Sequence, residues 1–136
     1  MYPPELVQPM RAELTDIGAS ELMSAADVDA WIGDARSGLL VFNSICGCAA
    51  GSARPGIGLA MQHGKRPERF ATVFAGQDQE ATAQARAHFA EVPPSSPSVA
   101  LVRDGKLVDF LPRQRIEGRR PDEIAGELTA MFDRHL

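Results

Sequence analysis

The chain reads GLLVFNSICGCAAG over residues 38–51, and this is the most informative pattern in the sequence. The apolar run from Gly38 to Asn43 predicts a short buried β-strand. Cys46 and Cys48, the two cysteines of the 136 residues, follow it, and small residues then begin a segment of helical length. The first amides of a helix lack internal partners and carry partial positive charge, so they stabilise a nearby thiolate. The stretch therefore predicts a redox or nucleophilic site.

The two thiols are expected to have different roles. Thiol–disulfide exchange requires a thiolate, and an ordinary cysteine with a pKa of about 8.5 is mostly protonated at neutral pH. Cys46 lies nearest the strand end and is the expected nucleophile, while Cys48, inside the turn, is the expected resolving thiol. Gly47 is expected to relieve crowding between the sulfurs and to adopt unusual backbone angles. A Cys-x-Cys disulfide closes a small, strained ring, which favours isomerisation or thiol removal over strong reduction.

Composition limits the class of protein. The hydrophobic share is 44%, the charged share is 24% and the length suits one domain, residues 1–136, typical of a soluble globular protein. The net charge of −4, with scattered Lys and Arg, predicts no nucleic-acid or membrane partner. The N-terminus lacks the layout of a secretory signal, and no apolar stretch approaches the ~20 residues of a membrane span. We therefore expect a cytoplasmic protein, in which a close cysteine pair is catalytic or metal-binding.

A metal site is the first alternative for the cysteine pair. A closed zinc site needs about four ligands, but the sequence offers one Cys-x-Cys and three widely spaced histidines, His63, His88 and His135. We therefore expect no metal ligands. None of the histidines has the setting of a catalytic base.

Helix and strand patterns alternate along the rest of the chain. Residues 4–17 predict an N-terminal helix, and Ser24 with Asp27 opens a second helix to about Arg36, with Trp31 in the core. The segment 49–63 predicts a helix kinked near its first turns by Pro55. The remaining predictions are a strand at 39–43, a strand at 70–74, a helix at 79–90, a hairpin of strands 98–102 and 106–110 around Arg103-Asp104-Gly105, and a helix at 121–134.

This order of elements, a βαβ unit and then a ββα unit, resembles a thioredoxin-like domain. The fold class is therefore α/β, with a central mixed sheet flanked by helices and an extra N-terminal helical extension over residues 1–20. In thioredoxin-like domains, a cis peptide bond before the hairpin strand faces the active thiols. The resemblance implies that Ser96-Pro97 is this bond and that Pro97 shapes the substrate groove; from the residues alone, Pro97 could equally be a simple strand-start proline.

Several motifs narrow the resemblance from a fold to one family. They are residues 7–14, 43–51, 53–55, 72–78, 80–82, 93–98 and 116–119, and together they resemble the bacilliredoxin family over nearly the whole chain. The resemblance implies a thiol-disulfide oxidoreductase that removes bacillithiol, a low-molecular-weight thiol, from mixed disulfides on cytosolic proteins. Bacillithiol would be a co-substrate, with no tightly bound cofactor. Two features depart from some relatives: the chain has no C-terminal cysteine, and Gln114 replaces a loop histidine, so we assign that loop no proton transfer.

Three residues near the thiols are candidates for substrate binding: Asn43, Arg54 and Ser96. The guanidinium of Arg54 could pair with the carboxylates of a thiol co-substrate, or it could be a solvated helix charge. Asn43 and Ser44 could instead hold the turn through side-chain-to-backbone hydrogen bonds.

Two other functions stay open from the sequence. One is a general protein disulfide isomerase or a weak thioredoxin-like reductase. The other is a non-enzymatic thioredoxin-like module that binds a metal or a partner through the same loop.

Overall fold

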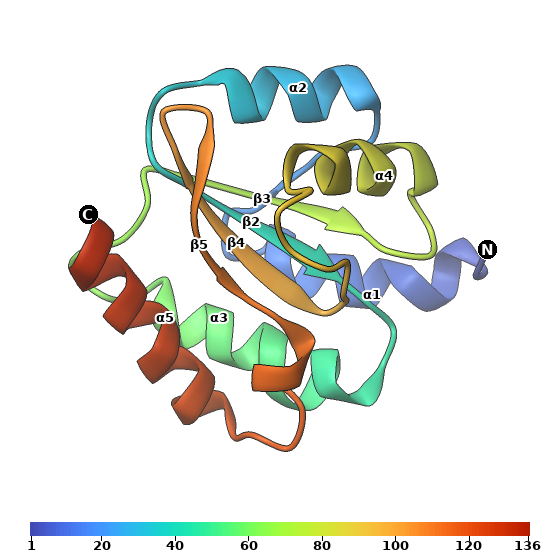
Figure 1. The fold of residues 1–136 in the computed structure, drawn as a ribbon. Coiled ribbons are helices and arrows are strands. Elements are labelled where there is room, and N and C mark those ends of the chain that lie inside the picture. The colour runs from blue at the N-terminus through green and yellow to red at the C-terminus, as the bar shows by residue number, and fades with distance from the viewer.

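A single mixed sheet of five strands, in the order β1-β3-β2-β4-β5, organises the computed structural model, which describes all residues 1–136 (Figure 1). β1, β2 and β3 are parallel, and β4 and β5 are antiparallel to their neighbours. The strands are β1 (Ser20–Glu21), β2 (Gly38–Asn43), β3 (Arg69–Phe74), β4 (Ser98–Arg103) and β5 (Lys106–Leu111). The helices are α1 (Pro4–Thr15), α2 (Ala25–Gly33), η1 (Ala49–Ala53), α3 (Arg54–Ala60), α4 (Gln79–His88), η2 (Arg113–Arg115) and α5 (Pro121–His135).

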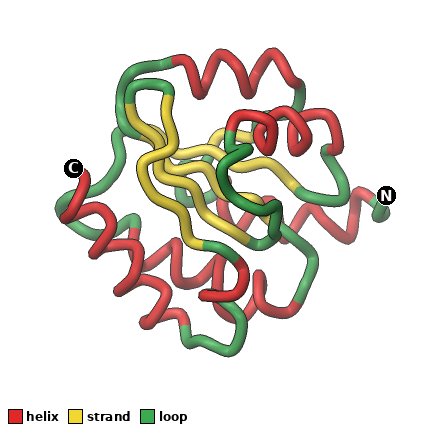
Figure 2. The backbone as a smooth tube through the Cα atoms, viewed as in Figure 1, coloured by secondary structure: helices red, strands yellow, loops and turns green.

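The central strand β2 is buried along its whole length because helices cover both faces of the sheet. Successive side chains of a strand point to opposite faces, so Leu39 and Val41 join one core while Leu40 and Phe42 join the other. Helices α2 and α4 cover one face, and α1, α3 and α5 cover the other (Figures 1 and 2). A continuous apolar run with helices on both sides is the pattern expected of an α/β sheet. The predicted fold class is confirmed.

The expected extra helix is present at the N-terminus. α1 packs on the same face as α3 and α5, where Leu14 shares a core with Ile57 and Ile124. The chain then turns through Gly18, which has a φ of 107°, into β1. β1 pairs with β3 through two residues and was not predicted, because so short a strand has no periodic pattern.

Local chemistry explains the element ends. α2 begins as predicted, since the Ser24 hydroxyl accepts a hydrogen bond from the Asp27 amide at 3.1 Å. It ends at Gly33 and not near Arg36, because Asp34 already has an extended backbone. The predicted hairpin forms around Asp104 and Gly105, whose positive φ values of 54° and 73° suit a two-residue turn with the twist of the strands.

Trp31 is half-buried and was correctly expected to belong to the core. Its ring packs against the α2/α4 core, and the Arg69 guanidinium lies over it, 4.4 Å from the ring centroid. The ring is therefore covered and does not offer a platform for a ligand.

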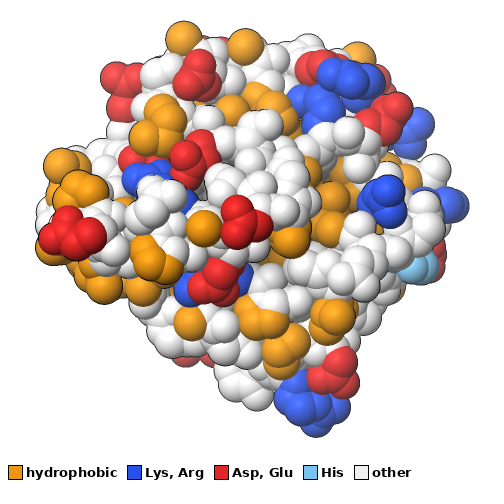
Figure 3. Space-filling model, turned by 180° about the vertical axis from the view of Figure 1, so that it is seen from behind, with side chains coloured by type: hydrophobic (Ala, Val, Ile, Leu, Met, Phe, Trp, Pro, Cys, Tyr) orange, Lys and Arg blue, Asp and Glu red, His pale blue; other side chains and the backbone are white.

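The outer surface is mixed in character. In the view from behind, basic side chains lie among acidic and apolar ones and form no single large patch (Figure 3). None of the helices combines the length and the apolar character that a membrane crossing would require.

Candidate active site

Three segments far apart in the sequence meet at one end of the sheet. β4 runs antiparallel to β2, with Phe42 opposite Ser98, so the start of β4 lies beside the end of β2. β5 runs antiparallel to β4, with Leu111 opposite Val99, so β5 ends at the same edge. The Cys-Gly-Cys loop follows β2, Pro97 precedes β4, and η2 follows β5. The topology therefore gathers these three segments around one site.

The two cysteines are free thiols with their sulfur atoms 2.8 Å apart. Both are partly exposed, in the turn between β2 and η1. The Cys46 carbonyl accepts hydrogen bonds from the Ala49 and Ala50 amides at 3.0 and 3.3 Å, which begins the helix. The pair therefore lies at a helix N-terminus, as the sequence predicts.

The first helical turn after the thiols is wider than an α-helix. The Arg54 amide bonds the Ala49 carbonyl, five residues back, before α3 continues in regular form. Pro55, with no N–H to donate, follows at once. The predicted disturbance near Pro55 is thus a π-type turn over Ala49–Ala53, a feature common at functional sites.

Hydrogen bonds to its sulfur make Cys46 the more acidic thiol. Burial opposes ionisation of this thiol, yet its pKa lies below the ordinary value. Bonds from the Cys48 thiol, the Ala49 amide and the Ser44 hydroxyl to the sulfur outweigh the burial. Cys46 is therefore favoured as the thiolate.

Cys48 is shifted in the opposite direction. Burial raises its pKa, and its hydrogen bond to Cys46 and the charge of that sulfur raise it further. The positive charge of Arg113 partly offsets this rise. A thiolate beside a protonated thiol is the arrangement that a nucleophile and a resolving group require.

Asn43 and Ser44 hold the loop before Cys46, as one interpretation of the sequence predicted. The Asn43 side-chain oxygen accepts from the Ser44 amide at 2.9 Å. The Ser44 hydroxyl accepts from the Cys46 amide at 3.2 Å. Asn43 is buried and its side-chain nitrogen donates to the Met10 carbonyl at 3.2 Å, so both ends of its amide bind protein groups. The side chain is thus not open to a substrate.

The position of Arg54 contradicts both roles suggested for it, the solvated helix charge and the partner of co-substrate carboxylates. Its side chain is only 2% exposed, so it is not a solvated helix charge. The guanidinium donates to the Asn43 side-chain oxygen at 3.0 Å and to the Ser44 carbonyl at 2.9 Å. It therefore does not face solvent, where the carboxylates of a co-substrate would arrive. A sequence cannot show that a charged residue after a buried helical turn points inward.

Gly47 also differs from the expectation. Its φ is not positive, and a Cβ built there would meet no atom within 4 Å. The two sulfurs meet across an ordinary turn of the backbone, so this conformation does not require glycine.

The Ser96-Pro97 peptide bond is cis, as predicted. Pro97 is buried and Ser96 is half-buried directly before β4. The Ser96 carbonyl accepts from the Arg113 guanidinium at 3.2 Å, so this carbonyl is already engaged by the protein.

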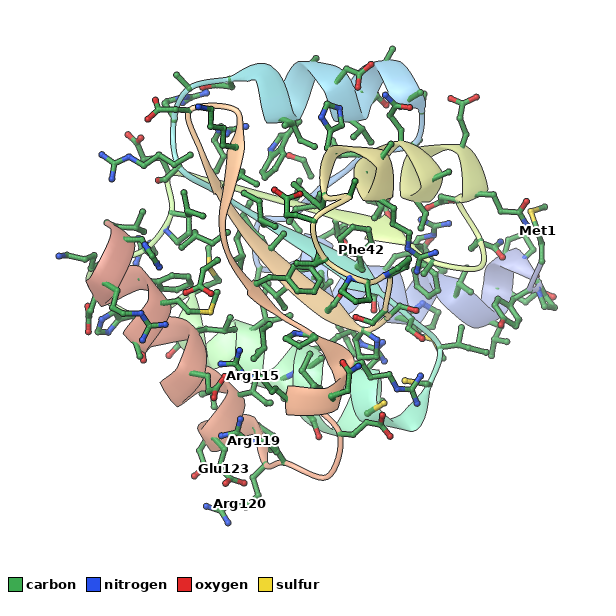
Figure 4. All side chains as sticks on the ribbon, in the orientation of Figure 1. Met1, Phe42, Arg115, Arg119, Arg120 and Glu123 are labelled. Carbon is green, nitrogen blue, oxygen red and sulfur yellow. The ribbon has the colours of Figure 1, made fainter.

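Arg113 lies near the two thiols, and sequence reasoning did not single it out. It begins η2, its side chain is 40% exposed, and it pairs with Glu117 at 3.0 Å. Arg113 bonds the Ser96 carbonyl and its charge acts on both thiols, whereas Arg115 and Arg119 pair with Glu127. Figure 4 shows Arg115 and Arg119 beside the start of α5. The sequence distance between Arg113 and the cysteines follows no motif, so only the sheet topology reveals the proximity.

The three histidines each contact a different aspartate. Each ring nitrogen contacts an aspartate: His63 with Asp133 at 3.0 Å, His88 with Asp29 at 2.7 Å, and His135 with Asp109 at 3.0 Å. No three His, Cys, Asp or Glu side chains come together in an arrangement that could hold a metal ion.

Solved structures show the same fold. Mitochondrial thioredoxin 3 of Saccharomyces cerevisiae is 17% identical, with a TM-score of 0.61, 90% of this chain covered and 98% of the other. Fasciola hepatica thioredoxin is 24% identical, with a TM-score of 0.58 and coverages of 85% and 98%. The likeness shows that the chain has a thioredoxin fold, and the dithiol lies at the end of β2 in that fold.

Sequence comparison narrows the class to a family. A family model described as disulphide isomerase matches residues 2–136. A bacilliredoxin of Cytophaga hutchinsonii is 47% identical over 133 residues, with 98% of each chain covered. A bacilliredoxin of Shouchella clausii is 49% identical over 135 residues, covering 98% of this chain and 93% of the relative. With the thioredoxin fold and the dithiol, these matches define the class of the protein as a thiol-disulfide oxidoreductase. The chain belongs to the bacilliredoxin family.

Proposed function

We propose that this protein removes bacillithiol from mixed disulfides on cytosolic proteins, with Cys46 as nucleophile and Cys48 as resolving thiol. The observation that carries the proposal is the contact between the two sulfurs, 2.8 Å apart, with the pKa of Cys46 lowered and that of Cys48 raised. The names of the relatives support bacillithiol as the thiol concerned. No tightly bound cofactor is needed for this chemistry.

The first step exchanges one disulfide for another. The Cys46 thiolate attacks the bacillithiol sulfur of the mixed disulfide, a new S–S bond forms to Cys46, and the substrate protein leaves as a thiolate. The leaving thiolate takes up a proton from water. No net oxidation occurs in this step, because one disulfide replaces another.

The second step releases the thiol. Cys48 loses its proton and attacks the sulfur of Cys46, which forms the Cys46–Cys48 disulfide and expels bacillithiol as a thiolate. The nearby charge of Arg113 favours this deprotonation, since it lowers the pKa of Cys48. The enzyme is left oxidised, so a thiol reductant must return it to the dithiol form.

Arg113 is also placed to receive the carboxylates of bacillithiol. Its guanidinium is partly exposed, lies close enough to both thiols for its charge to act on them, and can make bidentate contacts. This assigns to Arg113 the role that the sequence suggested for Arg54. Pro97 and Ser96 form the neighbouring wall of the groove in this proposal.

Disulfide isomerisation is a second candidate, favoured by the family description. It begins with the same attack by Cys46, but on a disulfide between two protein cysteines. The substrate protein then completes the exchange with another of its own thiols. In this reaction, Cys48 releases a substrate protein that stays bound to Cys46 through a disulfide, because it can attack that disulfide.

Transfer of the adduct tests the proposal. A bacillithiolated model protein is incubated with the Cys48→Ser variant, and peptide mass spectrometry locates the adduct. We expect the mass of bacillithiol on Cys46 and loss of the adduct from the substrate. Disulfide shuffling of a scrambled protein without any transfer would support the isomerase instead, and absence of both reactions would refute either function.

A further inference from the structure

The N-terminal helix α1 contacts the active-site loop through two polar groups. The Met10 carbonyl accepts from the Asn43 side chain at 3.2 Å. The Glu13 carboxylate lies 3.1 Å from Nε of Arg54, the first residue of α3. Both contacts join a helix at the start of the chain to residues around the cysteines.

Asn43 and Arg54 contact each other, and both also hydrogen-bond Ser44. The Asn43 side-chain oxygen accepts from both the Arg54 guanidinium and the Ser44 amide. Arg54 also donates to the Ser44 carbonyl. The backbone of Ser44 is therefore held at both its amide and its carbonyl.

Ser44 completes the path to the nucleophile. Its hydroxyl oxygen accepts from the Cys46 amide at 3.2 Å. The same hydroxyl is one of the groups that lower the pKa of the Cys46 thiol. Displacing Ser44 would remove its hydrogen bond to the Cys46 amide while leaving the helix amides in place.

The position of α1 is itself fixed. Arg11 makes two bonds to the Asp78 carboxylate, at 2.7 and 2.9 Å, next to the start of α4. Arg54 is buried, so its charge needs a partner, and Glu13 is the carboxylate in reach. Nε of Arg54 makes no hydrogen bond, so the Glu13 carboxylate, 3.1 Å away, acts on it through charge.

We propose that Glu13 and Arg54 are positioning residues, through which the N-terminal helix holds the Ser44 hydroxyl at the backbone amide of Cys46, beside the nucleophilic thiol. The proposal is independent of which disulfide the enzyme acts on. It assigns the added helix a part in the chemistry beyond covering the core.

The test measures the pH dependence of Cys46 alkylation by iodoacetamide in the full chain, followed by peptide mass spectrometry. We expect Ser44→Ala, Glu13→Gln and Arg54→Lys each to move the midpoint upward by about half to one pH unit, the size of one lost hydrogen bond beside the thiol. Glu5→Gln, which removes an exposed carboxylate of the same helix, is the matched control and should leave the midpoint unchanged. Circular dichroism confirms that each variant is folded.

The sign of the shift separates positioning from simple electrostatics. Removing the negative charge of Glu13 would by itself lower the pKa of a nearby thiol, whereas loss of positioning raises it. The double variant Glu13→Gln with Ser44→Ala should shift no further than Ser44→Ala alone, because both act through one hydroxyl. A downward or absent shift in Glu13→Gln and Arg54→Lys, or full additivity in the double variant, would overturn the proposal.

Discussion

Replacing Gly56 by alanine should destabilise the protein, although alanine is the better helix former. Gly56 lies in α3 where it meets α5, and a Cβ there would be 2.6 Å from Cβ of Ile124 and 3.0 Å from the Pro121 carbonyl oxygen. Neither atom is the mobile end of a side chain, so the two helices must separate. Overpacking costs about 1–3 kcal/mol, and the gain in helix propensity returns about 0.5–1 kcal/mol. The free energy of unfolding should therefore fall by roughly 1–2 kcal/mol.

Gly58, two positions further along the same helix, provides the control. A Cβ there would meet only Cδ1 of Ile17, at the ordinary contact distance of 3.9 Å. Gly58→Ala should therefore raise the free energy of unfolding, by up to about 1 kcal/mol. Urea unfolding followed by circular dichroism measures both variants. If Gly56→Ala were as stable as Gly58→Ala, the close approach of α3 and α5 described here would be incorrect.

Three further predictions concern the thiols. Cys46→Ser should abolish exchange with a mixed disulfide, whereas Cys48→Ser should still form a stable adduct; adducts found only on Cys48 would reverse the roles. In the wild type, Cys46 alkylation should rise with pH and reach half its maximum below the ordinary cysteine pKa, while Cys48 should react only at higher pH. Equal pH profiles for the two cysteines would contradict the hydrogen bonding described. Arg113→Gln should slow exchange with a bacillithiol adduct several-fold more than exchange with a neutral β-mercaptoethanol adduct on the same protein. The control Glu117→Gln should not show this difference. Equal slowing for both adducts would exclude recognition of the bacillithiol carboxylates by Arg113.

Residues with a local pattern were predictable from the sequence. The apolar run from Leu39 to Phe42, the turn at Asp104-Gly105 and the proline at the start of α5 each act through their near neighbours, and the structure contains all three features. The resemblance also led to the cis bond before Pro97. The two thiols could be placed at a helix N-terminus because strand, motif and helix are consecutive.

Residues whose role depends on distant segments were not predictable in the same way. Arg54 reads as a helix-surface charge, and only the packing of α1 shows that it is buried against Glu13. Arg113 joins the site because β5 ends beside the start of β4, which a single sequence does not reveal. Gly47 was assigned an unusual backbone from its residue type, although the turn around it is an ordinary one.

The position of the last turn of α5 bears on how this protein could be built into a fluorescent redox reporter. The carbonyl of His135, next to the last residue, accepts from Arg103, which ends β4 at the edge of the sheet opposite the thiols. A fused fluorescent domain would therefore start one strand length from Cys46, about 20 Å at ~3.3 Å per residue. A linker must cross this span, and an extended chain needs at least about six residues to do so. With a shorter linker, the dithiol would still be open to its substrates, but the fluorescent domain could not reach it.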